Sequence, residues 1–487
     1  MNMFKEGDNL SSQTKRGSIW VFFTNIFSNA LNVIISIVLA RWFLGPEEFG
    51  LIGITILVSE VIRMLSSQGI CDVIIYMKDE RPVAINTLFL LATALGLVLA
   101  GITVALTPAL VSYFKHEELR AIFPIVAISY PFISGSSITL ALLRKELKFK
   151  NESYVLLLSQ VISTSTTLIL VFLGFKVYAV IYGMVAKAVA TFALSFIFAK
   201  YFPKFEFDFQ VVKNTFNYVK YVTGELGVMF VLERTDQTVI PRFLGTAAMG
   251  FYTTAFNFIE YPLMMSRMTF HKVLFSGYSR LNENRARLKE VFLDISQHIS
   301  TLFIPLFMGL GAVAEPFIRF IIGTKWLPCV PLIQIISFYA LVKIIGITFP
   351  QIMKAVGKPK YLFYYNLVRA IIMIPALIAA AQYSINMVAL TMVSILWIFK
   401  PAQIWMLRRA IGITVKQYIK TCYVQLIAAA VMCISIYLVQ KALLSLGDGE
   451  MLLLLIVVGA VTYSGIMLLV DYKKSMEFIN FIKAYLK

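Results

Sequence analysis

Charged residues, cysteine and histidine are all scarce in this chain of 487 residues. Asp, Glu, Lys and Arg make up 14% of it, whereas about 25% is usual in soluble domains, so an ordinary soluble protein is excluded. The 4 cysteines and 3 histidines show neither a close pair nor the spacing of a metal site. We therefore expect no disulfide and no bound metal.

Motifs of nucleotide binding and of catalysis are also absent from the sequence. There is no GxxxxGK[ST] or GxGxxG phosphate-binding loop, no HExxH zinc motif and no nucleophile elbow. We therefore expect no enzyme activity and no cofactor. Any transport would have to be driven by a proton or sodium gradient, or by the concentration difference of the substrate itself.

What the sequence does contain is a series of long apolar segments. Hydrophobic residues make up 59% of the chain, and its mean hydropathy is +0.79. Segments of about 20 apolar residues, the length that crosses a bilayer, predict an all-α polytopic membrane protein with about 14 transmembrane helices. Residues 1–16 are polar and precede a full-length apolar run, which predicts a cytoplasmic tail and no cleavable signal peptide.

The net charge of +18 is compatible with nucleic-acid binding, but the positions of the basic residues favour a membrane. With residues 1–16 inside, most of the 44 Lys and Arg residues fall in the inner loops and tails, as the positive-inside rule requires. We therefore expect a plasma-membrane protein with both termini in the cytoplasm and no nucleic-acid partner. The expected neighbours of the basic loops are anionic membrane lipids.

One motif occurs twice in the chain. FLGPEEFG at residues 43–50 is followed 200 positions later by FLGTAAMG at residues 243–250, and each copy lies between two apolar segments. We interpret the motif as a tight turn between helices. Both copies fall outside in this topology, so the two halves share one orientation and form a parallel repeat.

The repeat also sets the expected domain boundaries. Between the two halves we expect Asp208 to cap a short helix at the depth of the headgroups. The predicted divisions are an N-lobe of six helices at residues 17–199, a cytoplasmic amphipathic linker at 200–220, a C-lobe of six helices at 221–407, and a C-terminal hairpin with a cytoplasmic tail at 408–487.

Several charged residues lie inside the predicted helices, where they are costly and usually face a cavity or a partner. Glu60 and Glu260 follow the two copies of the motif at the same spacing, which places both roughly 15 Å below the outer turns, near the midplane. Arg63 shares a helix face with Glu60, and Arg267 shares one with Glu260. The other charged residues considered at this stage are Glu233, Arg234, Asp236, Lys187, Lys343 and Arg369.

Two interpretations of these charges remain open. We expect Arg63, Arg234 and Lys187 to line a cavity, whereas Arg267 is equally compatible with a side chain that extends to the headgroups. The acids can form salt bridges with the bases or carry a coupling proton. The first helix adds a polar stripe that suits either sugar hydroxyls in a cavity or a helix–helix contact: Asn25, Asn29 and Asn32.

Several segments resemble one family of membrane proteins. LARWFLGPEEFG at residues 39–50 resembles the signature that ends helix 1 in Wzx-type polysaccharide flippases, which belong to the multidrug/oligosaccharidyl-lipid/polysaccharide exporter superfamily. The resemblance covers roughly residues 18–407. Further similar segments are LRKELKFK at residues 143–150, Asp236 with Gly245, Glu315 with Pro316, and GTKWLP at residues 323–328.

The resemblance implies a V-shaped pair of six-helix bundles that works by alternating access. It implies that an undecaprenyl-pyrophosphate-linked oligosaccharide moves from the inner to the outer leaflet of the bacterial plasma (inner) membrane, for synthesis of capsule, exopolysaccharide or the O-antigen of lipopolysaccharide. The implied partners are this lipid-linked oligosaccharide, glycosyltransferases and a polysaccharide polymerase. The bases that would bind the substrate diphosphate are Arg63, Arg234, Arg267, Lys187, Lys343 and Arg369.

The related lipid II flippases also place important arginines in the helices that hold Arg63 and Arg267 here. Those relatives carry a buried charge in helix 1, and this chain does not. The alternative function is a cation or drug antiporter of the same superfamily, which would need an acidic or aromatic cavity, whereas bases slightly outnumber acids inside the predicted helices. A membrane-bound sugar polymerase or ligase is a further alternative. It would need a large outer loop for its catalytic groups, and the predicted outer loops are all short.

Overall fold

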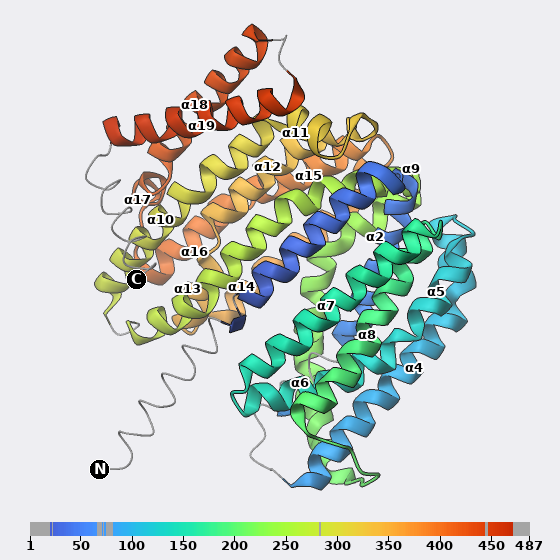
Figure 1. Cartoon of the computed structure of the whole chain (residues 1–487). Coiled ribbons are helices and arrows are strands. Elements are labelled where there is room, and N and C mark those ends of the chain that lie inside the picture. Colours follow the sequence, from blue (N-terminus) through green and yellow to red (C-terminus); the bar gives the residue numbers. More distant parts are fainter. Residues whose placement is uncertain are drawn as a thin grey trace. The chain divides into compact units, whose positions relative to one another are not determined.

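The computed structural model describes residues 20–21, 23–65, 71, 73–74, 81–281, 284–443 and 447–470. Every element in these ranges is a helix, and short turns connect most of them (Figure 1). By its internal contacts the chain divides into two compact units, with the boundary between Gly250 and Phe251.

The first unit contains the N-terminal helices. Its first span, Phe23–Phe43, ends in a π-helical turn, η1 (Leu39–Phe43). The helices that follow are α2 (Pro46–Arg63), α4 (Pro82–Phe114), α5 (Leu119–Ala127), α6 (Ser129–Lys145), α7 (Phe149–Phe172), α8 (Val177–Ala199) and the first part of α9 (Phe209–Arg280).

The second unit begins within α9 and ends in a helical hairpin. In that hairpin, α18 packs against α19 and also against α10, and the Tyr463 hydroxyl donates to the carbonyl of Thr301 at 2.9 Å. The remaining elements are α10 (Arg285–Ala312), α11 (Ala314–Ile321), η3 (Thr324–Trp326), α12 (Cys329–Ile345), α13 (Phe349–Ala355), α14 (Pro359–Ala380), α15 (Ile385–Ile398), α16 (Lys400–Ile411), α17 (Val415–Lys420), α18 (Tyr423–Ala442) and α19 (Asp448–Val470).

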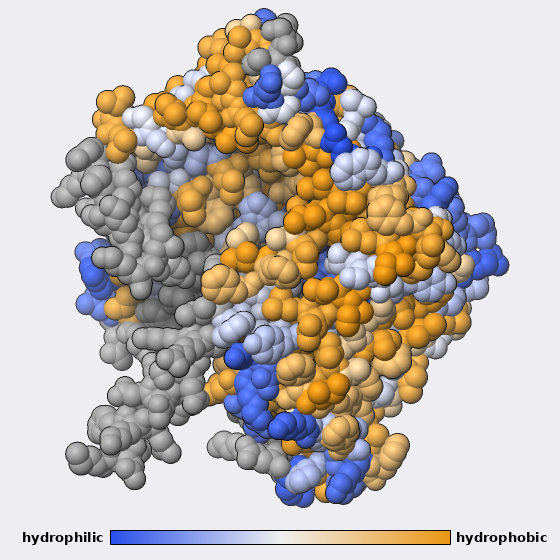
Figure 2. Space-filling view, in the orientation of Figure 1, coloured by the Kyte–Doolittle hydropathy of each residue, from blue (hydrophilic) through white to orange (hydrophobic). Residues whose placement is uncertain are grey.

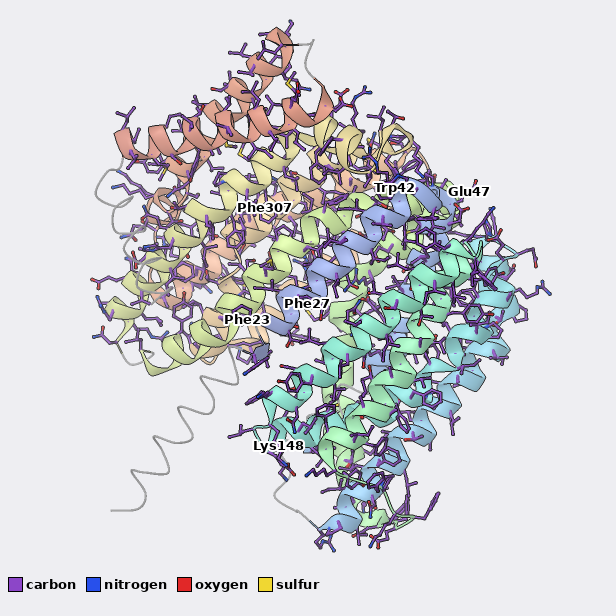
Figure 3. The ribbon with its side chains drawn as sticks, viewed as in Figure 1. Phe23, Phe27, Trp42, Glu47, Lys148 and Phe307 are labelled. Atoms are coloured by element: carbon purple, nitrogen blue, oxygen red, sulfur yellow. The ribbon has the colours of Figure 1, made fainter. Side chains whose placement is uncertain are left out.

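The first span runs along α7 in the same direction. The rings of Trp20 and Tyr154 are in contact at one end, and those of Phe43 and Phe172 at the other. Figure 3 accordingly shows Trp42 and Glu47 at one end of the first unit and Lys148 at the other. Between these ends the visible surface is mainly hydrophobic (Figure 2), as expected for helices that face lipid.

Eleven helices in the described part of the chain are long and apolar enough to cross a membrane. This confirms the all-α polytopic membrane class, although the number is below the about 14 spans expected from apolar segments. Helices α2 and α9 are not among the eleven. Because Glu47, Glu48, Glu60 and Arg63 all lie in α2, a count based on composition passes over this helix.

Three of the spans are interrupted, and a proline follows each interruption. Pro131 follows the break between α5 and α6, Pro350 the break between α12 and α13, and Pro401 the break between α15 and α16. A proline has no N–H, so it leaves the carbonyl four residues earlier without its helical donor. The continuous apolar runs of these spans predict uninterrupted helices.

In the second unit, side chains satisfy the carbonyl groups around the break after Ile345. Lys400 Nζ donates to the carbonyl of Val342 at 3.2 Å, and Gln403 Nε2 donates to that of Gly346 at 3.3 Å. The Tyr418 hydroxyl donates to the carbonyl of Ile345 at 2.6 Å. Polar backbone at membrane depth therefore finds partners within the protein, as hydrocarbon surroundings require.

Both copies of the repeated motif form the turns that we predicted. Gly45 is extended, with φ −97° and ψ 179°, and α2 begins at the next residue. Its N–H donates to Glu48 Oε2 at 2.9 Å, which caps the start of α2. Gly245 has φ +85° and ψ 174°, a conformation that favours glycine, and it separates two helical segments within α9.

The final glycines of the two copies allow these helices to cross in close contact. A Cβ atom on Gly50 would overlap the carbonyl oxygen of Thr246, and one on Gly250 would overlap the carbonyl oxygen of Pro46. Pro46 and Thr246 occupy the same position in the two copies. The contact between the two copies of the motif is therefore reciprocal. It lets the backbones of the two copies touch.

The segment between α8 and α9 contains the predicted helix cap. The backbone N–H of Gln210 donates to Asp208 Oδ1 at 2.9 Å, which confirms Asp208 as the cap. Helix α9 begins at Phe209 and continues past residue 220, so the short helix predicted in the linker is the first part of a longer one. The predicted lobe boundaries stay a prediction.

The glycine crossing can be tested by adding one methyl group. Gly50→Ala and Gly250→Ala should each lower the free energy of unfolding by about 1–3 kcal/mol or more, because the backbones must move apart. The measurement is the thermal unfolding midpoint in detergent, followed by size-exclusion chromatography. Gly101→Ala is the matched control, since nothing lies within 4 Å of a Cβ there. Equal midpoints for all three variants would contradict the proposed close contact.

Candidate functional site

Glu60 is held by two arginines in the first unit. Its Oε2 lies 2.8 Å from Nε of Arg234, and its Oε1 accepts from Nη2 of Arg234 at 3.0 Å. This is the bidentate geometry that makes an arginine–carboxylate pair strong. Nη2 of Arg63, one turn along α2, lies 4.0 Å from Oε1. The structure thus brings together three of the predicted residues.

The glycine crossing explains why these residues meet. Helix α2 runs away from the crossing toward Glu60, while the first part of α9 runs toward the crossing from Arg234. Gly50 faces Thr246 at one level, and Glu60 faces Arg234 further along, so the two helices are antiparallel neighbours. At 1.5 Å per residue the ion pair lies roughly 15 Å from the crossing, about halfway across the hydrocarbon.

Lys187 belongs to a second chain of contacts in the first unit. Its Nζ donates to Gln160 Oε1 at 2.6 Å, and Gln160 Nε2 donates to Asn32 Oδ1 at 2.9 Å. These hydrogen bonds link α8, α7 and the first span. Arg63 lies close enough to Lys187 for the two positive charges to repel each other. The two groups of contacts are therefore electrostatically connected.

The other predicted residues of the first unit lie on α9 and on the first span. Glu233 and Asp236 lie on α9 beside Arg234, and Asp236 is buried with 1% of its surface exposed. Asn25 and Asn29 are half-buried on the first span. Of the three predicted asparagines, Asn32 is the one with a described hydrogen bond to another helix.

Two predicted bases of the second unit lie over aromatic rings. Nζ of Lys343 lies over the ring of Tyr339 at 4.8 Å, and the guanidinium of Arg369 lies over the ring of Tyr365 at 6.0 Å. Glu260 is half-buried on α9. Arg267 belongs to α9, but its side chain lies outside the described residues.

Sequence reasoning missed Gln160, which connects Lys187 to Asn32. A signal was present, because Gln160 is a lone amide in the apolar run of α7. From the sequence, Lys400 is equally compatible with a side chain that extends to the headgroups and with a functional role. The structure buries Lys400 against the break in α12, so it does not extend to the headgroups. Within the described ranges, no group of three His, Cys, Asp or Glu residues could hold a metal ion.

A double-mutant cycle tests the ion pair. Glu60→Gln and Arg234→Gln should each destabilise the protein, and their coupling energy should reach about 1–3 kcal/mol, because each single change leaves a partly buried charge without its counterion. The measurement is the unfolding free energy in detergent. The same cycle at Arg287 and Glu290, an exposed pair on α10, should give at most about 0.5 kcal/mol. Equal coupling at the two pairs would contradict a special role for Glu60.

Comparisons with known proteins agree with this architecture. A family profile described as "Polysaccharide biosynthesis protein" matches residues 38–331, a range that includes both copies of the motif. The chain is 24% identical over 335 residues to the succinoglycan biosynthesis transport protein ExoT of Rhizobium meliloti, covering 69% of this chain and 67% of that protein. It is 23% identical over 376 residues to the lipopolysaccharide biosynthesis protein WzxC of Escherichia coli, covering 77% and 76%.

Solved structures share the fold. The lipid II flippase MurJ, in an inward closed conformation, aligns with a TM-score of 0.74 at 18% identity and covers 92% of this chain and 98% of its own. An inward-facing multidrug resistance MATE family transporter aligns with a TM-score of 0.61 at 14% identity, covering 79% and 94%. The chain belongs to the polysaccharide biosynthesis protein family.

Proposed function

We propose that this protein is an alternating-access flippase for an undecaprenyl-pyrophosphate-linked oligosaccharide. It would carry this substrate from the inner to the outer leaflet of the bacterial plasma membrane during synthesis of a surface polysaccharide. The observation that carries the proposal is the group formed by Arg63, Arg234, Lys187 and Glu60 inside the helices of the first unit. It holds three basic side chains and one acid.

The substrate explains why such a group would be retained in a membrane. A diphosphate is the part of the lipid-linked oligosaccharide that is most costly to move through hydrocarbon. Arginine can bind it with two parallel hydrogen bonds and keeps its charge in apolar surroundings. Glu60 would then serve as an internal counterion, which occupies Arg234 while no substrate is bound and gives way to the diphosphate when it enters.

The ends of the first unit support an orientation with its basic end in the cytoplasm. Lys148 lies at the end opposite Trp42 and Glu47 (Figure 3). Arg144, Lys145 and Lys150 are close to Lys148 in sequence, whereas the other end carries both acidic and basic residues. This asymmetry follows the positive-inside rule. We further propose that α2 and both segments of α9 cross the membrane besides the eleven apolar spans, for a total of 14.

The contacts of Glu60 argue against the alternative of a cation or drug antiporter. Such a carrier needs a carboxylate that can exchange a cation or a proton with its substrate. Here Arg234 binds both oxygens of Glu60, and Arg63 adds a second positive group nearby. The positive charge of these bases would repel a cationic substrate near the acid.

Alanine substitutions test the proposed diphosphate site. Arg63→Ala and Arg234→Ala should abolish surface polysaccharide and cause the lipid-linked intermediate to accumulate in the inner leaflet, because each removes a diphosphate contact. The measurements are surface polysaccharide staining and extraction of the lipid-linked intermediate from cells. Arg120→Ala is the matched control, because Arg120 pairs with Glu117 in an exposed position. Normal export by both cavity variants would refute the proposal.

The coupling role of the acids needs a separate measurement. If Glu60 or Glu260 carries a coupling proton or sodium ion, its Glu→Gln variant should flip substrate in proteoliposomes at a rate that no longer responds to an imposed gradient. The wild-type rate should rise with the gradient. Equal responses of wild type and both variants would assign the acids a salt-bridge role only.

A further inference from the structure

The segment between α8 and α9 presents phenylalanines to the outside. Residues 201–209 read YFPKFEFDF. They follow Ala199, the last residue of α8, and Phe198 accepts a hydrogen bond from Asn151 at the start of α7. The segment therefore lies at the same end of the first unit as Lys148.

An alternating pattern divides this segment into two faces. Glu206 accepts from Asn86 Nδ2 at 2.8 Å, and Asp208 lies 3.2 Å from Nη2 of Arg81, so the acids contact the start of α4. Phe205, Phe207 and Phe209 alternate with these two acids and are turned away from α4. Phe205 is 97% exposed, Phe207 61% and Phe209 72%. Phe202, at 76%, adds a fourth exposed ring.

Hydrogen bonds hold the backbone in this arrangement. The N–H of Lys204 donates to Asn86 Oδ1 at 3.3 Å, and the N–H of Asp208 donates to Thr87 Oγ1 at 2.9 Å. The hydroxyl of Tyr201 also donates to Asn86. Burial, and to a smaller extent the negative charge of Glu206, raises the pKa of Tyr201 to about 12, so this donor keeps its proton at physiological pH. The rings are thus held outward by a fixed backbone.

The position of the segment matches the membrane interface. Helix α8 has 23 residues and is roughly 34 Å long, slightly more than the hydrocarbon thickness of about 30 Å, so its end reaches the headgroups. Ile197, 64% exposed, belongs to the lipid-facing surface of α8, and Phe202 continues that surface by packing on Phe196. Lys200 and Lys204 add positive charge beside the rings, while the nearby acids are engaged by α4.

We propose that Phe202, Phe205, Phe207 and Phe209 insert into the headgroup region of an anionic bilayer, with Lys200 and Lys204 at the lipid phosphates. The occupant of this face is a lipid surface, because the rings continue the lipid-facing side of α8 and the adjacent charge is positive. The rigid attachment to α4 makes the segment an anchor that fixes the depth of the first unit in the leaflet.

The depth of one ring in the bilayer tests this proposal. A nitroxide label on Phe205→Cys, in a variant whose four native cysteines are replaced, is measured by electron paramagnetic resonance in proteoliposomes of phosphatidylethanolamine and phosphatidylglycerol. Its collision rate with oxygen, relative to a water-soluble nickel complex, reports depth. We expect a ratio severalfold above that of Glu117→Cys, in an exposed turn, and below that of Leu97→Cys, in the middle of α4.

Two further variants complete the test. Phe207→Cys gives an independent reading if the first variant does not fold. Lys200→Gln combined with Lys204→Gln should lower the ratio at position 205 in vesicles with phosphatidylglycerol and leave it unchanged in neutral vesicles. A ratio at both labelled positions equal to that of Glu117→Cys would place the segment in water and overturn the proposal. That outcome would indicate a surface for a soluble protein.

Discussion

The close approach of two backbones at Gly50 and Gly250 is the constraint on which the first unit depends. Hydrophobic attraction between helices is weak in lipid, so helices associate through packing and polar contacts, and a glycine lets two backbones touch. Here the contact is reciprocal: each glycine faces the carbonyl of the first helical residue of the other copy, Pro46 or Thr246. It fixes the register of α2 against α9, and this register in turn places Glu60 opposite Arg234.

The sequence predicted the turns and the class of protein, but not the pairing of the charges. Each motif ends one apolar run and begins another, so the turns at Gly45 and Gly245 could be found by inspection. Helical spacing placed Arg63 on the same helix face as Glu60, whereas the residue that takes both carboxylate oxygens is Arg234. Such contacts between residues far apart in the sequence depend on the register of one helix against another. The local sequence pattern carries no information about that register.

The two copies of the repeat differ in the charged residues of the helix that precedes each turn. The shift of 200 positions that aligns Glu60 with Glu260 aligns Arg234 with Ile34, and Asp236 with Ser36. The second copy of the helix before the turn is therefore charged where the first is neutral or polar. The arginine that binds the acid of α2 therefore has no counterpart at the aligned position of the first span.

The interrupted helices of the second unit have a mechanical consequence. Lys400 follows the break between α15 and α16, and it donates to a carbonyl just before the break between α12 and α13. Gln403, on the same helix, donates to Gly346 within that break. Two interruptions on separate spans are thus connected by two side-chain hydrogen bonds. A change of angle at either interruption would disturb the hydrogen bonds that connect it to the other. We therefore expect the angles at the two interruptions to change together.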